Sequence, residues 1–146
     1  MWVAHLNRLP TRVRLVSWGL NIPSSCCLCS VMEETREHLL LRCVFSAQIW
    51  HLVQSKLRLS PCIFISWTSL LVWMKLKIEF APPILRKLVS HATVYHVWKQ
   101  RNNLLHNGSS LSPLATFKEI DREIRNTITA RRNRKAFRSL MLLWIR

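Results

Sequence analysis

The sequence predicts a mainly α-helical protein, a small helical domain with a cysteine- and histidine-rich module near its N-terminus. The 146 residues include only two glycines and six prolines, so the signals for strands and tight turns are scarce. Apolar residues make up 49% of the chain, and several stretches repeat them at helical intervals. Four of the five cysteines lie within residues 26–43.

The first half of the chain contains two predicted helices. Residues 9–19, LPTRVRLVSWG, predict a short helix with Thr11 near its N-cap and Gly19 as its terminator. A second helix is expected from about Phe45 to Leu57, because apolar residues recur there every four positions. Between these helices, three acids precede the apolar stretch HLLL: Glu33, Glu34 and Glu37. Acids in this position suit the first turn of a helix.

The second half contains the clearest helical signals. The prolines at 82–83 open a helix that is expected to end near His106. Its predicted apolar face carries Ile84, Leu88, His91, Tyr95 and Trp98. The Ser-Pro pair at 112–113 opens another helix. The apolar stripe of that helix consists of Phe117, Ile120, Ile124 and Ile128. Residues 58–81 are apolar and leave the choice between helix and strand open.

The chain is strongly basic. Lys and Arg number 22 against seven acids, which gives a net charge of +15 and a pI near 11.1. Such a field attracts polyanions, either nucleic acid or an anionic membrane, in a salt-dependent manner. Residues 124–146 contain no acid. The candidate phosphate contacts in this segment are Arg131, Arg132, Arg134, Lys135 and Arg138. The alternative is that this block is only a solvated surface.

Two further groups are candidates for contact with nucleic acid. Trp98 and Arg101 suit a single strand, because an aromatic face beside an arginine can stack on and hydrogen-bond to an exposed base. The alternative places Trp98 in the core and Arg101 in solvent. A second, weaker patch combines Arg8, Arg12, Arg14, Trp2 and Trp18. His91 lies on a predicted apolar face, where we expect a hydrogen-bonded core histidine.

No segment predicts export or insertion into a membrane. The N-terminus lacks the apolar region of a secretory signal. The longest apolar run, residues 63–74, has 12 residues where a membrane span needs about 20. We therefore expect an intracellular protein, in the nucleus or the cytoplasm. Thiols stay reduced in these compartments, which favours metal ligation over disulfides for clustered cysteines.

The cluster CCLCSVMEETREHLLLRC at residues 26–43 has the spacing of a metal site. Cys26 and Cys29 are separated by two residues, so the turn between them directs both sulfurs at one ion, whereas Cys27 lacks this spacing. His38 and Cys43 supply a second pair. The pattern predicts these four residues as ligands of one Zn²⁺ with no open position, which is typical of structural sites. The alternatives are a disulfide or a chance cluster in which His38 is an ordinary helix residue.

The same residues resemble a known family. LPTRVRL and Trp18-Gly19 precede the Cys-x-Leu-Cys turn, and EETREHLLLRC and Trp50 follow it. This order resembles the zinc-binding domain that follows the reverse transcriptase in plant non-LTR retrotransposon polyproteins, over residues 2–54. The segment YHVWKQRNNLLHN at 95–107 resembles, more loosely, a W-x-x-R-N motif of such polyproteins.

The resemblance implies a fold stabilised by one structural zinc on the four ligands already named. It also implies a parent-element reverse transcriptase as a partner. The family's domain normally begins upstream of Met1, so we expect an N-terminally truncated copy. The expected organisation is a zinc-binding domain at residues 1–57 and a helical C-terminal region with a basic tail at residues 58–146.

We expect a non-catalytic function. Polymerases and nucleases of the two-metal type hold their ions with several carboxylates, whereas Asp121 is the only aspartate of the chain. The sequence predicts no catalytic residue and no small-molecule substrate. The expected function is zinc-stabilised binding of RNA or DNA, largely independent of sequence.

Three alternatives to nucleic-acid binding stay open. The first is a retroelement remnant without activity, which would unfold with poor cooperativity because part of its N-terminal packing is missing. The second is a protein-interaction module with a tryptophan-rich surface. The third is attachment of the basic and apolar C-terminus, FRSLMLLWIR, to a membrane surface in the manner of an interfacial helix.

Overall fold

The computed structural model describes residues 1–146 and confirms the mainly α-helical fold. The only β pairing is an isolated antiparallel bridge between Ser25 and Glu33. η1 is one turn of π-helix and η2 is a 3-10 turn. In chain order the helical elements are α1 (Trp2–His5), α2 (Arg12–Ser17), η1 (His38–Arg42), α3 (Val44–Lys56), α4 (Trp67–Lys75), α5 (Pro83–Asn107), α6 (Pro113–Ala130), η2 (Lys135–Phe137) and α7 (Leu140–Ile145).

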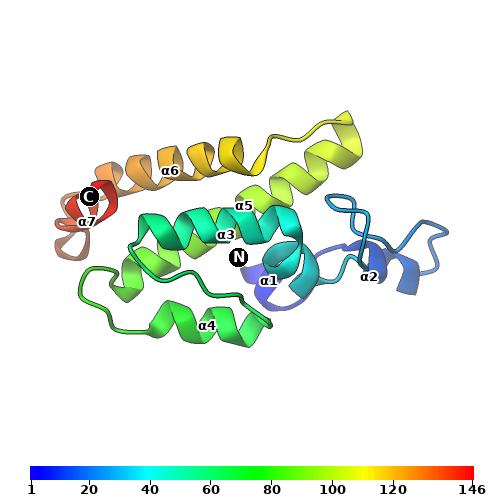
Figure 1. The fold of residues 1–146 in the computed structure, drawn as a ribbon, viewed down its shortest axis with the longest axis horizontal. Helices are drawn as coiled ribbons and strands as arrows, with labels where there is room; N and C mark the ends of the chain where they lie inside the picture. Colours follow the sequence, from blue (N-terminus) through cyan, green and yellow to red (C-terminus); the bar gives the residue numbers. More distant parts are fainter.

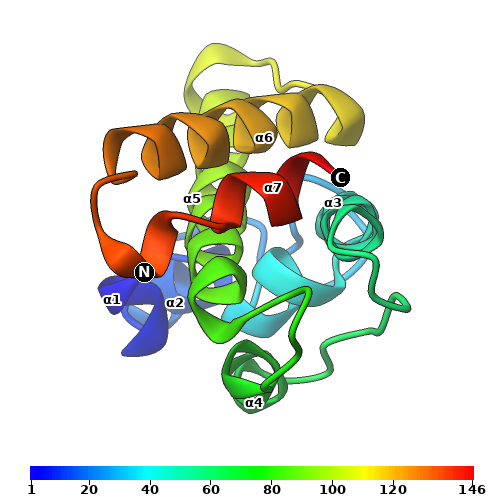
Figure 2. The same cartoon turned by 90° about the vertical axis from the view of Figure 1, so that its left-hand side faces the viewer.

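The long helix α5 forms the centre of the molecule (Figure 2). It packs against both α6 and α4, and α3 contacts α5 and α6. In Figure 1, α6 lies above α3 and α4 lies below it, with α5 crossing behind. The segment around α2 projects at one end of the long axis, and α7 with the C-terminus occupies the other end. The fold is therefore a short stack of helices around one central helix.

The helix α6 confirms its predicted amphipathic pattern. Ile120, Ile124 and Ile128 are buried, and Phe117 packs at the edge of the core. Ser112 is the N-cap, and its hydroxyl accepts a hydrogen bond from the Ala115 N–H at 3.2 Å. A helix at the edge of a stack buries a single stripe, which is why its periodicity is visible in the sequence.

The helix α5 has the predicted bounds to within a residue, but its predicted apolar face is only partly confirmed, since Ile84, Leu88 and Trp98 pack against the core. His91 and Tyr95 are exposed, so His91 is not a core histidine. The buried positions mix apolar and polar side chains: Leu85, Arg86, Val89, Ser90, Ala92, Thr93, Val94, His96, Val97, Gln100 and Arg101. A central helix is covered on several sides, and internal hydrogen bonds allow polar residues on those sides. Hydrophobic periodicity alone therefore does not identify its buried face.

The ambiguous middle of the chain contains a helix, α4. Ser66 caps it, because its hydroxyl accepts from the Ser69 N–H at 3.2 Å while the Ser69 hydroxyl accepts from the Ser66 N–H at 3.2 Å. Trp73 of α4 meets Trp50 of α3 and Phe64 edge to face, with ring centroids 6.4 and 5.4 Å apart. This aromatic cluster fixes α4 and the extended segment before it against α3.

The C-terminal helix α7 packs into the molecule. Leu140 and Trp144 are buried, and the indole N–H of Trp144 donates to Asp121 of α6 at 2.8 Å. These two side chains are thus not available to a membrane surface, whereas Leu142 and Ile145 of the same helix are 59% and 46% exposed. No helix of the protein has the combination of length and apolar character needed to cross a bilayer.

The segments 1–57 and 58–146 contribute to one hydrophobic core. The buried cluster runs from Ala4 and Cys26 through Trp50 to Val97 and Trp144 without a break. The peptide link between the two segments lies in the short connection from α3 to α4. The zinc-binding sequence is therefore packed against the helical region, and changes in either segment affect the same core.

We expect Ile124→Ala to destabilise the protein. Ile124 is fully buried on α6, and removing three methyl or methylene groups at such a site costs about 2–5 kcal/mol of unfolding free energy. Lys118→Ala, on the exposed face of the same helix, should change stability by less than about 0.5 kcal/mol. Urea denaturation of both variants checks this, and equal stabilities would contradict the position of α6 in the core.

Candidate metal centre

A tight hairpin carries the first two candidate ligands, Cys26 and Cys29. The Cys26 N–H donates to the Met32 carbonyl at 2.7 Å, and the Ser30 N–H donates back to the Cys26 carbonyl at 2.7 Å. Ser30 adopts a left-handed conformation with φ 58°, which closes the turn. The hairpin therefore turns both sulfurs to the same side, as the two-residue spacing predicts.

The wide turn η1 carries the other two ligands. His38 and Cys43 are five residues apart, a spacing that places them about 140° apart around a regular α-helix. Here the Cys43 N–H donates to the His38 carbonyl at 2.6 Å, which widens the turn and brings both residues to one side. The Thr35 hydroxyl accepts from the His38 N–H at 3.1 Å and starts the turn.

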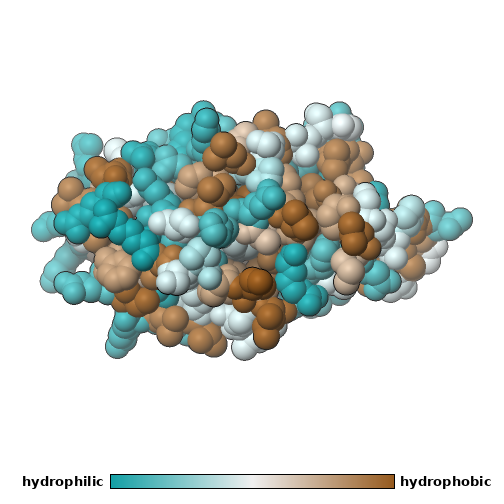
Figure 3. All heavy atoms as spheres, in the orientation of Figure 1, coloured by the Kyte–Doolittle hydropathy of each residue, from teal (hydrophilic) through white to brown (hydrophobic).

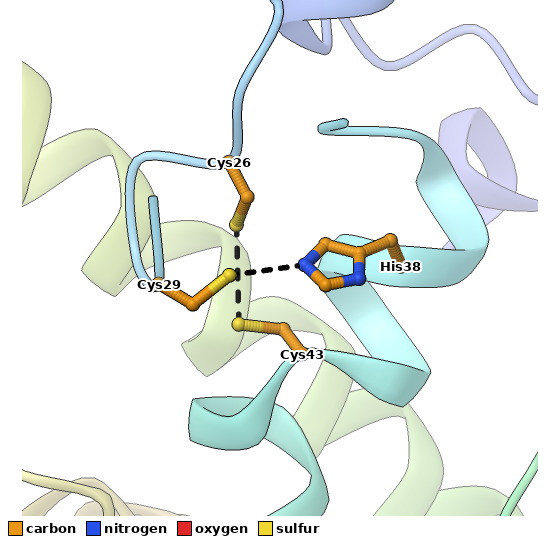
Figure 4. A group of neighbouring side chains, drawn as sticks. All are labelled: Cys26, Cys29, His38 and Cys43. Atoms are coloured by element: carbon orange, nitrogen blue, oxygen red, sulfur yellow. Dashed lines mark hydrogen bonds between the residues drawn. The ribbon is translucent and has the colours of Figure 1, made fainter. Parts of the chain in front are cut away.

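The four side chains converge on one point (Figure 4). The sulfurs of Cys26 and Cys43 are 3.9 Å apart, the Cys29 sulfur is 3.2 Å from His38 Nε2, and all four ligand atoms lie within 4.8 Å of one another. Atoms at the corners of a zinc tetrahedron are about 3.3–3.8 Å apart, given bond lengths of about 2.0–2.3 Å. Three thiols and one imidazole in this arrangement fit one Zn²⁺ after small side-chain adjustments.

The protonation of the sulfurs also suits a metal. The hydrogen bond between Cys26 and Cys43 lowers the pKa of Cys26 to about 5, against the opposing effect of burial, and raises the pKa of Cys43. Backbone N–H groups of Leu28 and Cys29 further favour the Cys26 thiolate. One sulfur is thus readily available as the thiolate that zinc binds.

The site is closed. Cys26 and Cys43 are fully buried, His38 is 7% exposed and Cys29 is partly buried. Four protein ligands fill a tetrahedron, so a bound ion keeps no position for water or substrate, and its contribution is to folding. Of the remaining cysteines, Cys27 points away from the cluster and Cys62 lies exposed beside Gln54, so neither is a ligand.

A buried carboxylate, Glu34, anchors this module to the rest of the fold. Its Oε1 accepts from the Arg12 N–H at 3.0 Å and from Arg101 Nη2 at 2.7 Å, and its Oε2 accepts from the Cys27 N–H at 3.2 Å. The sequence predicted Glu34, with Glu33 and Glu37, as an acid of a helical first turn. That expectation is wrong for Glu34. Its carboxylate instead accepts from the first N–H of α2 and from the backbone of the cysteine hairpin.

Arg101 therefore has a structural position. Its side chain is 4% exposed, its guanidinium pairs with Glu34, and Nη2 also donates to the Pro10 carbonyl at 3.1 Å. Neither solvent nor a nucleic acid reaches it, which corrects both interpretations given above. Trp98 is partly exposed, but the Arg101 guanidinium, 4.8 Å from its ring centroid, covers one face. The sequence contained one signal for this pairing. Glu34 lies in EETREHLLLRC and Arg101 lies in YHVWKQRNNLLHN, the two segments that carry the family resemblance.

The other predicted contacts lie on the surface. Arg131, Arg132, Arg134, Lys135 and Arg138 are all exposed in the connection between α6 and α7. In the weaker patch, Arg12 is drawn inward, because its Nη1 donates to the Ser25 carbonyl at 2.9 Å. Trp2 and Trp18 are exposed, but Trp2 lies near α4 whereas Trp18 follows α2.

The comparisons with known proteins agree with this geometry. Residues 1–50 match the model of a family described as zinc-binding in reverse transcriptase. The matched region is 50 of the 146 residues and contains all four candidate ligands. Neither the curated proteins nor the solved structures contain a match to the chain. The match confirms a reverse-transcriptase-type zinc-binding domain at residues 1–50, and the zinc assignment therefore rests on both geometry and family.

We expect one zinc ion per chain in protein purified without chelator. The double variant His38→Ala, Cys43→Ala should lose the ion and most of the stability of the N-terminal module, because structural zinc contributes on the order of 10 kcal/mol in small domains. Elemental analysis and thermal unfolding measure both effects. Cys62→Ser is the matched control, since it removes an exposed thiol outside the site and should retain the zinc. Zinc loss in that control would contradict the ligand set.

We also expect Arg101→Met to destabilise the protein by about 3–5 kcal/mol, because the variant leaves the Glu34 carboxylate buried without its charged partner. Arg122→Met breaks an exposed ion pair with Glu119 and should cost less than about 1 kcal/mol. Adding Glu34→Gln to Arg101→Met should cost less than the sum of the single variants. Additive costs in urea denaturation would show that the two side chains do not act together.

Proposed function

We propose that this protein is a zinc-stabilised, non-catalytic module that binds RNA or DNA largely independently of sequence. We further propose that it derives from a plant non-LTR retrotransposon polyprotein and acts inside the cell, with the parent-element reverse transcriptase as a possible partner. The observation that supports binding most directly is a compact group of exposed, unpaired basic side chains. We call this group the basic block; it consists of Arg131, Arg132, Arg134, Lys135 and Arg138.

The basic block is available to phosphates. None of its five side chains forms an ion pair with a carboxylate, whereas arginines elsewhere on the surface, such as Arg122 and Arg125, do. Its backbone is held in place, because Phe137 is buried and the Arg131 guanidinium lies 5.7 Å from the Phe137 ring centroid. The cations are thus presented on an ordered connection, which favours contact with a polyanion.

Neighbouring elements add positive charge to this end of the molecule. Lys56, in the last turn of α3, lies 6.0 Å from the ring of Trp144 in α7. Figure 3 shows hydrophilic residues gathered at the end where α7 lies. A purely structural explanation for these basic residues is that cations stabilise the C-terminus of α6 through the helix dipole. That effect falls off within one turn and needs one or two charges, whereas the basic block has five.

The proposed role of zinc is to fold the module, and the proposed role of the basic block is to bind nucleic acid. Phosphate contacts of this kind carry no sequence information by themselves. A module with these properties would hold a template close to a polymerase without selecting its sequence. This role in a parent element follows from the family resemblance and is part of the proposal.

A second candidate function is binding of a protein partner. The sequence suggested a tryptophan-rich surface for this function. Four of the seven tryptophans are instead buried, namely Trp50, Trp67, Trp73 and Trp144. The observation that favours this function is instead a cavity of about 690 Å³ beside α3. Val44 and Ile63 border it and are 65% and 77% exposed. Binding that does not weaken with salt would indicate this function.

We expect the affinity for nucleic acid to fall steeply with salt, and the variant Arg131→Ala, Arg132→Ala, Arg134→Ala to flatten that dependence. Loss of three phosphate contacts should reduce the slope of log K against log salt concentration by about 2–3. Fluorescence anisotropy with labelled RNA and DNA at several salt concentrations measures the slope.

The matched control is Arg42→Ala, Lys75→Ala, Lys118→Ala, which removes the same charge from three exposed sites on other elements. It should leave the slope nearly unchanged. Equal slopes for both triple variants would show that net charge, and not the basic block, causes binding. Absence of binding by the zinc-loaded protein, with poorly cooperative unfolding, would favour the inactive remnant.

A further inference from the structure

Trp18 is exposed without a structural reason in the fold. Only Trp2 and Trp18 among the seven tryptophans are exposed, and Trp18 leaves 60% of its surface in solvent. Tryptophan is large and is highly buried on average, so an ordered, exposed indole is informative. Trp18 ends the helix α2, and Gly19 follows with φ 89°. A Cβ at Gly19 would meet no atom within 4 Å, so this turn is open to solvent.

A guanidinium lies next to this indole. Arg14 is one turn earlier on α2, and its Cζ is 5.8 Å from the centroid of the Trp18 ring. Arg14 forms no ion pair. The first 32 residues contain no acid, and Arg8 is a further exposed cation in this segment. An aromatic face and a free cation thus stand side by side in a locally basic segment.

A polar pocket adjoins the same arginine. It has a volume of about 310 Å³ and lies between α2 and the start of η1. Its lining includes Asn7, Thr11, Arg14, Ser17 and Thr35. The only acid that borders it, Glu37, is paired with Arg36, so the pocket does not repel an anion through a free carboxylate. Arg14 therefore links an apolar stacking face to a pocket lined by hydroxyl and amide groups.

We infer that Trp18, Arg14 and this pocket form a binding subsite for one nucleotide of a single strand. The base stacks on the open face of Trp18, Arg14 contacts the phosphate, and the polar pocket accepts the sugar and phosphate edge. A base paired inside a duplex has no free face for such stacking, so the subsite selects single-stranded nucleic acid. The inference rests on the proposed function and adds a substrate class to it.

The subsite and the basic block serve different purposes. In Figure 1, α2 and α7 lie at opposite ends of the long axis. Phosphate contacts at the basic block hold single and double strands alike, whereas stacking at Trp18 discriminates between them. The competing occupant is a protein, because Val16 and Leu20 beside Trp18 are 40% and 46% exposed. The polar pocket and the free arginine favour the nucleotide over an apolar protein segment.

The test compares binding of a labelled oligouridylate and of an RNA duplex of equal length to the zinc-loaded full chain. We expect Trp18→Ala to weaken oligouridylate binding by about fivefold or more, since one stacked base is worth that much or more. Duplex binding should stay within about twofold. Trp18→Phe should keep most of the affinity, because phenylalanine also stacks. Arg14→Ala should lower the salt slope for the oligouridylate by about 0.7.

Trp2→Ala is the matched control, because it removes the other exposed indole, which is 71% exposed and lies near α4. It should leave both affinities unchanged, and zinc content verifies that each variant is folded. Unchanged oligouridylate binding in Trp18→Ala, or an equal loss with both nucleic acids, would overturn the subsite while the proposed function stands. Failure of the wild-type chain to bind either probe would overturn the proposed function itself.

Discussion

The carboxylate of Glu34 joins three parts of the chain that are distant in sequence. It accepts hydrogen bonds from the first N–H of α2, from the cysteine hairpin and from Arg101 of the central helix α5. A buried charge of this kind is tolerated only when its partner and hydrogen bonds are all in place. This interaction, together with the buried apolar side chains of η1, therefore holds the zinc module against the helices, and it also orients α2.

The zinc site and the Glu34 network constrain the same short segment in different ways. Zinc fixes the side chains of the hairpin and of η1 relative to each other, and Glu34 fixes the hairpin relative to α5. Neither constraint replaces the other, because the four ligands lie in the hairpin and in or directly after η1, whereas Glu34 pairs with Arg101 of α5. Together with the buried side chains of Leu39, Leu40 and Leu41, they hold the first fifty residues in one arrangement.

This arrangement separates two surfaces. The ordered metal module presents Trp18 and Arg14 at one end of the molecule, and the connection between α6 and α7 presents the basic block at the other. The packed helices α3, α5 and α6 lie between them. If both surfaces contact one strand, these helices set the distance between stacking and phosphate contact. The zinc then serves binding indirectly, by holding one of the two surfaces in place.

The sequence by itself determined the four residues of the candidate zinc site, the bounds of α3 and α5, and the start and the buried stripe of α6, because each depends on spacing within one turn or one short segment. Only the tertiary structure decided that residues 67–75 form a helix, which face of α5 is buried, and that Arg101 pairs with Glu34. These features depend on contacts between residues far apart in the chain. A buried ion pair produces no periodic pattern in the sequence. A helix that is covered on several sides buries residues on several faces, so its hydrophobic residues no longer follow a single helical stripe.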